Sequence, residues 1–301
     1  MDHHVTTPAL AHRSPRLRGR GAPSQLHQGG RGAACDAGRD QQSGEVAGRL
    51  LRPAAVPAAG AGIGRATADI IVREGGTVIA VEIDNARLDK MAGELADAAG
   101  RVEGRCIDAM DEVQVRALVA ETEAAHGGVD ILVNAVGGST IVDNPSAIIE
   151  DLTFDEWRKL IDFNLSATFL FTNAIVPGMK RAGSGKIVNL SSIAGRGLSG
   201  KSSSAYAAAK GGIIALTRKL ASELGPFGVN VNAIAPSLTL TERLMPHWEK
   251  RSAEDQAMEI DQVPLKRIAT AVDQARVIAF LASQDADFVT GLTIDVTGGL
   301  S

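Results

Sequence analysis

From about residue 58 onward, short runs of apolar and β-branched residues alternate with longer stretches that have a helical period. Such alternation is typical of βαβ units, in which helices cover both faces of a parallel sheet. The strand candidates are apolar almost throughout, as expected when both faces of a sheet are buried. The pattern therefore predicts an α/β fold with a doubly wound parallel sheet of Rossmann type, in a single domain that spans residues 58–301.

The elements follow from this alternation. The expected strands are Thr77–Ile83, Arg105–Ile107, Ile131–Ala135, Lys186–Leu190, Val229–Ile234 and Thr293–Val296. The expected helices are Ile63–Glu74, Ala86–Ala98, Glu112–His126, Phe154–Lys180, Ser203–Leu224 and Thr270–Ser283.

Residues 1–57 have a different composition. They hold eight arginines, no lysine and four of the six histidines, with much Gly, Ala, Pro and Ser and no sustained period. A disordered tail, an organellar transit peptide and a stretch outside the native reading frame are three interpretations. We expect a disordered or non-native N-terminal extension, and rank targeting last because the arginine-containing segments form no amphipathic helix.

Composition and charge exclude several classes of function. Hydrophobic residues make up 45% and charged residues 22%, as in a globular protein. The net charge of -4 predicts no nucleic-acid partner, and no run approaches the roughly 20 apolar residues of a membrane span. The unlike surroundings of Cys35 and Cys106 favour free thiols and a cytoplasmic location. Neither CxxC nor HExxH occurs, so no metal is expected.

A glycine-rich turn precedes the first expected helix. Gly60, Gly62 and Gly64 would let the backbone approach an anion at a helix N-terminus, where free N–H groups favour a pyrophosphate. On this motif alone, an ordinary turn is equally acceptable. Glu82 follows Gly62 by twenty residues and could accept hydrogen bonds from ribose hydroxyls. It would repel a 2′-phosphate, and no arginine beside it or at position 61 could hold one, so NAD is favoured over NADP.

Tyr206 is the only tyrosine of the chain, and Lys210 follows it by four residues. On a helix the two side chains share a face, and the ammonium group would lower the pKa of the phenol toward working pH. Such a tyrosine suits general acid/base catalysis on a carbonyl or alcohol. On this spacing alone, a surface Tyr–Lys pair is the better interpretation.

Taken together, these motifs resemble the short-chain dehydrogenase/reductase family in order and spacing, over residues 60–301. The resemblance implies an oxidoreductase that transfers a hydride between NAD(H) and a small secondary alcohol or ketone. The nearest subgroup, the 3-oxoacyl-acyl-carrier-protein reductases, usually prefers NADP, which disagrees with Glu82. Weighing the subgroup against Glu82, we expect an NAD-linked alcohol or 3-hydroxyacyl dehydrogenase. The motifs are Gly62-Ile63-Gly64, Asn134-Ala135-Val136-Gly137, Asn164, Ser191-Ser192, Tyr206 through Lys210, and Asn232 through Pro236.

The resemblance also implies roles for single residues. Tyr206 resembles the acid/base, and Lys210 the residue that lowers its pKa and holds the nicotinamide ribose. Ser192 resembles the serine that hydrogen-bonds the substrate oxygen, and Asn164 the asparagine that holds a relay water. Asn134 is similar to a strand-end residue that stabilises the sheet beside the cofactor. The expected cofactor-binding residues are Gly60, Gly62, Ile63, Gly64, Glu82, Ile83, Asp108, Ala109, Asn134, Ala135, Gly137, Tyr206, Lys210, Pro236 and Thr239.

The first strand departs from the family pattern. Pro57 and Ala58 stand where the family has a Thr-Gly pair, and Pro53 lies just upstream. Proline cannot donate to a ladder, and Ala58 replaces a glycine where the backbone can need an unusual φ. We expect a degraded first strand and a reading frame that becomes native only near residues 58–60, which resequencing codons 40–65 would test. A dinucleotide-binding protein without catalysis and an inactive product are the alternatives.

Two segments, 138–149 and 238–264, should border the substrate pocket. The second contains Leu244, Met245 and Trp248 among several charges and is expected to form a mobile lid. No cluster of arginine or lysine in either segment demands a phosphate or carboxylate. By resemblance we expect a homotetramer, which the broadly apolar helices 154–180 and 203–224 would fit, although packing within one subunit explains them equally well.

Overall fold

Seven parallel strands form the main sheet of the computed structural model, which describes residues 53–199 and 201–300. Their order is β3-β2-β1-β4-β5-β6-β9, and β7 and β8 pair separately. The strands are β1 (Ala54–Pro57), β2 (Thr77–Glu82), β3 (Arg101–Cys106), β4 (Ile131–Asn134), β5 (Gly185–Leu190), β6 (Val229–Pro236), β7 (Thr239–Leu240), β8 (Ala269–Thr270) and β9 (Thr293–Val296).

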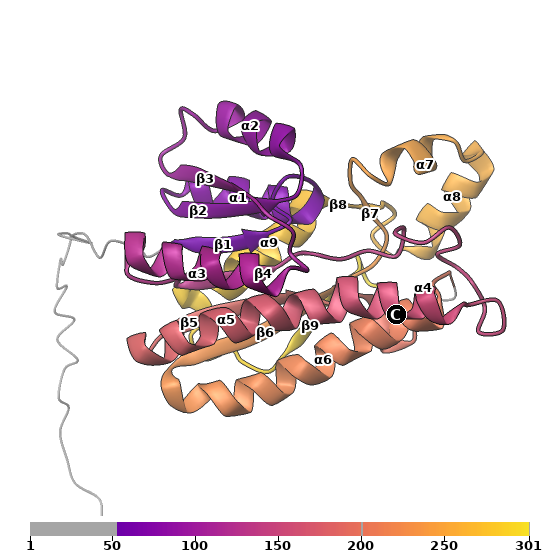
Figure 1. Cartoon of the computed structure of the whole chain (residues 1–301). Helices are drawn as coiled ribbons and strands as arrows, with labels where there is room; N and C mark the ends of the chain where they lie inside the picture. Colours follow the sequence, from indigo (N-terminus) through magenta and orange to yellow (C-terminus); the bar gives the residue numbers. More distant parts are fainter. Residues whose placement is uncertain (1–52, 200, 301) are drawn as a thin grey trace, which may run out of the picture. The chain divides into compact units, whose positions relative to one another are not determined.

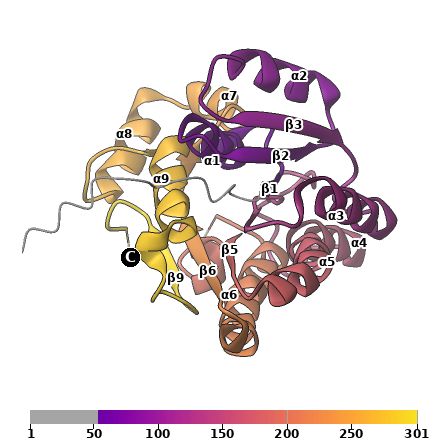
Figure 2. The same ribbon diagram turned by 90° about the vertical axis from the view of Figure 1, so that its left-hand side faces the viewer.

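Helices cover both faces of this sheet. Figures 1 and 2 show α1 and α9 on one face and α3, α5 and α6 on the other, which confirms the predicted doubly wound fold. A π-helical turn, Asp162–Ser166, joins α4 to α5. The helices are α1 (Gly62–Arg73), α2 (Asn85–Glu94), α3 (Glu112–His126), α4 (Phe154–Ile161), α5 (Ala167–Ala182), α6 (Ser204–Leu224), α7 (Met245–Glu249), α8 (Ala253–Gln262) and α9 (Ala271–Ala282).

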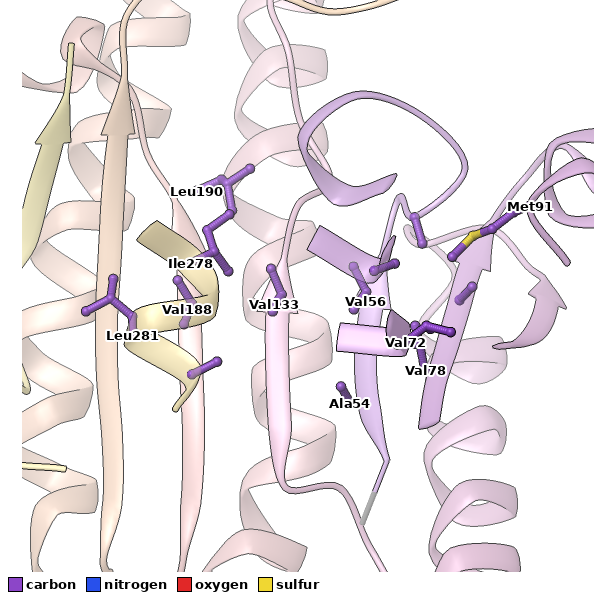
Figure 3. Close-up of a cluster of buried hydrophobic side chains, with 14 of the residues drawn as sticks. Ala54, Val56, Val72, Val78, Met91, Val133, Val188, Leu190, Ile278 and Leu281 are labelled. Carbon is purple, nitrogen blue, oxygen red and sulfur yellow. The ribbon is translucent and has the colours of Figure 1, made fainter. Parts of the chain in front are cut away.

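The two layers of the core follow from the alternation of side chains along each strand. Val56 of β1 packs in one apolar cluster with Val72 of α1 and Ile278 of α9 (Figure 3). Ala55, its neighbour on the same strand, belongs to the opposite cluster, which includes Phe171 of α5. Each large apolar side chain that is fully buried stabilises the fold by about 1.5–3 kcal/mol.

The first strand corrects the sequence interpretation. β1 is buried along its whole length, and Ala54 pairs in register with β2 on one side and β4 on the other. Pro53 lies before the strand and Pro57 is its last residue, so neither proline interrupts the ladder. The structure thus adds β1, which ends one residue before the expected boundary at residue 58, to the sheet of this domain. Residues 1–52 of the expected N-terminal extension lie outside the residues that the structure describes.

Ala58 confirms one part of that interpretation. Its φ is 61°, in the left-handed region that favours glycine. Alanine therefore occupies a position where a glycine would be less strained. The hypothesis about the reading frame remains a prediction.

Three other elements differ from expectation. β3 begins at Arg101 rather than Arg105, because an edge strand with charged side chains lacks the apolar run by which buried strands are recognised. The helix expected over 154–180 is divided by the π-helical turn. α2 ends at Glu94, four residues earlier than expected.

One helical stretch, Phe154–Ala182, is long and apolar enough to cross a membrane by length and composition alone. This differs from the expectation that no segment approaches a membrane span. The core helix of a globular protein meets the same criterion, and here Phe171, Ile175 and Met179 are buried against the sheet. The apolar side chains of this stretch thus form part of the hydrophobic core.

Candidate active site

A cavity of about 850 Å³ opens where the strand order reverses, beyond the carboxyl ends of β1 and β4. Crevices at this point of open α/β sheets are the usual ligand sites of such folds. The glycine-rich turn after β1 lines one end of the cavity, and Tyr206 and Lys210 line the other. The volume lies in the range of small-molecule and cofactor pockets, about 300–1,000 Å³.

The turn after β1 depends on its glycines. A Cβ on Gly64 would stand 2.3 Å from the carbonyl oxygen of Ala58, so only glycine allows α1 to begin this close to β1. A Cβ on Gly60 would stand 2.6 Å from Oε2 of Glu82. The expected turn and the expected acidic residue are therefore brought together.

An anion already lies at this turn. The backbone N–H of Gly62, the first residue of α1, donates to Oε2 of Glu242 over 2.8 Å. The free N–H groups and the dipole of a helix N-terminus favour negative charge. The carboxylate of Glu242 shows that this donor is directed at an anion, so the turn fits the pyrophosphate of a dinucleotide.

The surroundings of Glu82 correct a second expectation. Nη1 of Arg87, from α2, lies 3.9 Å from Oε2 of Glu82, and Nε of Arg87 lies 3.3 Å from Asp84. The sequence interpretation placed no arginine beside Glu82, which is wrong. The side chain of Glu82 is 10% exposed and lines the cavity, so its carboxylate lies at the nucleotide end with a cation next to it.

Tyr206 and Lys210 lie where α6 meets the cavity. The hydroxyl of Ser203 caps the helix by accepting from the N–H of Tyr206 over 3.4 Å. One turn later, Nζ of Lys210 lies 5.7 Å from the centre of the Tyr206 ring and donates to the carbonyl oxygen of Leu190 over 2.8 Å. The predicted shared face is therefore present, with Lys210 buried beneath the tyrosine.

The expected lowering of the Tyr206 pKa is not found. Burial raises the pKa of Tyr206 above its ordinary value, while a hydrogen bond from Ser192 and the charge of Arg243 act in the opposite direction. Burial, with a smaller contribution from the charge of Arg243, lowers the pKa of Lys210 to about 7. Burial is the largest cause of both shifts, because desolvation penalises a phenolate and an ammonium group alike.

The structure distinguishes the two serines after β5. The hydroxyl of Ser191 donates to the carbonyl oxygen of Lys210 over 2.8 Å and so joins β5 to α6. The hydroxyl of Ser192 is the one that hydrogen-bonds Tyr206, and it also accepts from the N–H of Ala194 over 3.2 Å. Ser192 therefore faces the tyrosine, whereas Ser191 holds the helix that carries it.

Asn164 lies in the π-helical turn and is fully buried. Its Oδ1 accepts from the N–H of Gly138 over 2.9 Å, and its Nδ2 donates to the carbonyl oxygens of Gly138 and Leu160. A Cβ on Gly137 would stand 2.7 Å from Asn164 Oδ1 and 2.9 Å from Lys210 Nζ. The loop after β4 thus brings Asn164 and Lys210 to the same point, and π-turns of this kind often occur at functional sites.

Asn134 joins four elements beneath the cavity. Its Nδ2 donates to Oγ1 of Thr172 over 3.0 Å and to Oδ1 of Asn189 over 2.8 Å. Asn189 in turn donates to Thr217 over 3.0 Å. This buried chain links β4, α5, β5 and α6, which fits the predicted stabilising position of Asn134.

Several predicted residues lie outside the wall of the cavity. Ile83 is 68% exposed, and the carboxylate of Asp108 accepts from the N–H of Met110. Ala109 also lies away from the cavity lining, whereas Thr239 and Pro236 belong to it. Fewer of the residues predicted for the nucleotide end therefore line the cavity than of those predicted for the end that holds Tyr206.

Sequence reasoning missed several charged residues that line the cavity, among them Arg87, Glu242 and Arg243. Glu242 and Arg243 directly follow Thr241 in the segment expected to form a lid. Their position in that segment was the only feature of the sequence that could have indicated them. They were overlooked because a single arginine in a mixed segment does not form a cluster.

The chain is similar in sequence to known reductases and dehydrogenases. A family model described as enoyl-(acyl carrier protein) reductase matches residues 58–301. The 3-oxoacyl-acyl-carrier-protein reductase of Thermotoga maritima is 33% identical, over 81% of this chain and 96% of its own length. The 7alpha-hydroxysteroid dehydrogenase of Bacteroides fragilis is 34% identical, over 82% of this chain and 93% of its own length.

A solved structure agrees with these sequences. The NAD-bound crystal structure of a 3-oxoacyl-acyl-carrier-protein reductase from Brucella melitensis is 34% identical, with a TM-score of 0.74. The match covers 84% of this chain and 94% of that one. The fold, the family model and the relatives agree: the chain belongs to the short-chain dehydrogenase/reductase family of oxidoreductases, whose members use nicotinamide dinucleotides.

Proposed function

We propose that the protein is an NAD-dependent enzyme that interconverts a secondary alcohol and a ketone, with Tyr206 as the general acid/base. The main support for this proposal is the arrangement around Tyr206, which lines the cavity. Ser192 is hydrogen-bonded to Tyr206, and the buried Lys210 lies on the same face of the helix. A bound nicotinamide would donate or accept the hydride. The residues of the chain would then handle the proton.

The proton is handled at the oxygen of Tyr206. In ketone reduction the phenol gives its proton to the substrate oxygen, which the hydroxyl of Ser192 holds by a hydrogen bond. The phenolate that remains is stabilised by Ser192 and by a protonated Lys210. Because the pKa of Lys210 is about 7, this amine can take up a proton at neutral pH. Asn164 would hold the loop after β4 in place and carry the relay water that the resemblance implies.

The nucleotide would lie along the rest of the cavity. Its pyrophosphate would take the place of the Glu242 carboxylate at Gly62, and its adenine ribose would face Glu82. Lys210 and Thr239 would contact the nicotinamide end. Ala135, Gly137 and Pro236 would form the wall between these ends.

The choice of NAD over NADP is supported by the carboxylate of Glu82 beside Gly60. In Glu82→Ala, we expect the ratio of kcat/KM for NADP to that for NAD to rise about 10- to 100-fold, the effect of one to two charge-assisted hydrogen bonds. Removal of the acid ends its repulsion of a 2′-phosphate and frees Arg87 to bind it. Adding Arg87→Ala to this variant should cancel most of the gain, and an unchanged ratio in Glu82→Ala would contradict the assignment.

The substrate is proposed to carry an apolar body, as a 3-oxoacyl or 3-hydroxyacyl compound does. The lining of the cavity includes Phe163, Leu190, Leu238 and Leu244. Relatives named for 3-oxoacyl and for hydroxysteroid substrates are consistent with such a wall.

Turnover with a panel of secondary alcohols and ketones, some with and some without a carboxylate, tests the proposed function. Formation of NADH from NAD and the alcohols, or its loss with the ketones, is the expected result. Binding of NADH without turnover of any compound would favour a dinucleotide-binding protein without catalysis. Failure to bind either dinucleotide would favour an inactive product.

Assembly and location are also proposals. Phe154 is 72% and Phe169 51% exposed on the helical stretch 154–182, which supports contact with further subunits in a homotetramer. The free thiol of Cys106 is exposed, as suits a reducing cytoplasm.

A further inference from the structure

Arg243 lies at the catalytic end of the cavity, on the segment between β7 and α7. Its two terminal guanidinium nitrogens are each 2.6 Å from the point where a Cβ on Gly138 would stand. Nη1 also donates to the carbonyl oxygen of Gly137 over 3.5 Å, which is a weak contact. The absence of a side chain at Gly138 therefore gives the guanidinium its space, against the backbone that Asn164 holds.

The guanidinium of Arg243 has no counter-ion in the described part of the chain. The adjacent acid, Glu242, is directed away from it to the N–H of Gly62. At the nucleotide end, by contrast, the cations are paired. Arg65 lies 2.8 Å from Asp69 and 2.6 Å from Glu94, while Arg87 contacts Asp84 and Glu82.

The charge of Arg243 acts on both reacting groups: it opposes the rise that burial causes in the pKa of Tyr206, and it adds to the fall in the pKa of Lys210. Leu244 and Phe163 line the same cavity, and Arg243 itself is exposed. Its planar guanidinium fork matches a carboxylate, which can accept two parallel hydrogen bonds.

We propose that Arg243 binds a carboxylate of the substrate, so that the enzyme selects oxo acids and hydroxy acids over neutral ketones and alcohols. This inference rests on the proposed function for the reaction and names the substrate class of the same site. The carboxylate meets Arg243 while the carbonyl to be reduced faces Tyr206 and Ser192. Arg243 is thus a specificity-determining residue.

The test measures binding to the protein–NADH complex and does not depend on turnover. Short-chain 2-oxo, 3-oxo and 4-oxo acids and their methyl esters are titrated while NADH fluorescence is followed. We expect at least one acid to bind wild-type protein about 10- to 100-fold more tightly than its ester, the effect of a charge-assisted hydrogen-bonded pair. Arg243→Met should remove this preference, and Arg243→Lys should keep part of it. Arg276→Met, which changes an exposed arginine of α9 outside the cavity, should behave as wild type.

Three results would overturn the proposal: equal binding of every acid and its ester, no binding of any acid, or an equal loss for acid and ester in Arg243→Met. A weaker Kd for NADH as the only change in Arg243→Met would also overturn it and assign the arginine to the cofactor. Turnover is measured on the same compounds. Acid-selective binding without turnover would refute the proposed reaction and leave the assignment of Arg243 standing.

Discussion

Replacing Tyr206 by phenylalanine is expected to lower kcat by about 10²- to 10⁴-fold, the contribution typical of a general acid/base. The change removes one oxygen and keeps the ring beside Nζ of Lys210. Because the turn after β1 and Glu82 lie at the other end of the cavity, the Kd for NADH should stay within about threefold of wild type, a shift of less than 1 kcal/mol. Single-turnover kinetics and NADH titration together measure both quantities.

The two serines after β5 provide a matched control. Ser192→Ala removes the hydroxyl that hydrogen-bonds Tyr206, so kcat should fall while the fold is kept. Ser191→Ala removes the link to the carbonyl oxygen of Lys210, so its main effect should be on stability. Turnover of Tyr206→Phe at a rate close to wild type would remove the phenol from the mechanism.

The alternation of apolar runs and helical stretches was enough to predict six of the seven strands of the main sheet and the helices that cover it, because buried parallel strands have a simple signal. It did not predict the short helices α7 and α8. The signal fails where burial is partial or the strand is short. β3 is an edge strand with charged side chains, and β1 is a four-residue strand next to two prolines. In β1, Pro53 and Pro57 lie at the ends of the ladder, a distinction that residue types alone do not make.

In the site, too, some features could be predicted from the sequence and others could not. Tyr206, Lys210, Ser192 and Asn164 could be proposed from motif order, and the fold brings them to one end of the cavity or directly beneath it. Contacts between distant segments could not be proposed. The placement of Glu242 at Gly62 spans 180 residues, since it depends on how the segment after β7 returns to the turn after β1.

The sign of the tyrosine pKa shift was wrong for a related reason. A lysine four residues away on a helix suggests a stabilising positive charge, and this holds in water. Burial reverses the result, because desolvation penalises the phenolate and the ammonium group together. Sequence spacing places two groups on a face but does not tell how much water reaches them.

Lys210 should also make the stability of the ligand-free protein depend on pH. Its pKa is about 7 in the folded protein, against 10.5 for an exposed lysine. Between these values the unfolded chain binds a proton that the folded protein does not, so the free energy of unfolding rises with pH. The slope from this one group approaches about 1.4 kcal/mol per pH unit inside the window and vanishes below it, where both states are protonated.

Denaturant unfolding at pH 7, 8 and 9 measures that slope. We expect Lys210→Met to be less dependent on pH than wild type, with the difference growing through the window because the variant has no amine to discharge on folding. Lys219→Met is the matched control: this lysine of α6 has a side chain that is 70% exposed, so its removal should leave the slope unchanged. Equal slopes for wild type and Lys210→Met would mean that the buried amine stays protonated in the folded protein. Lys210 would then carry a permanent positive charge beneath Tyr206, and uptake of a proton by this amine could not be part of the mechanism.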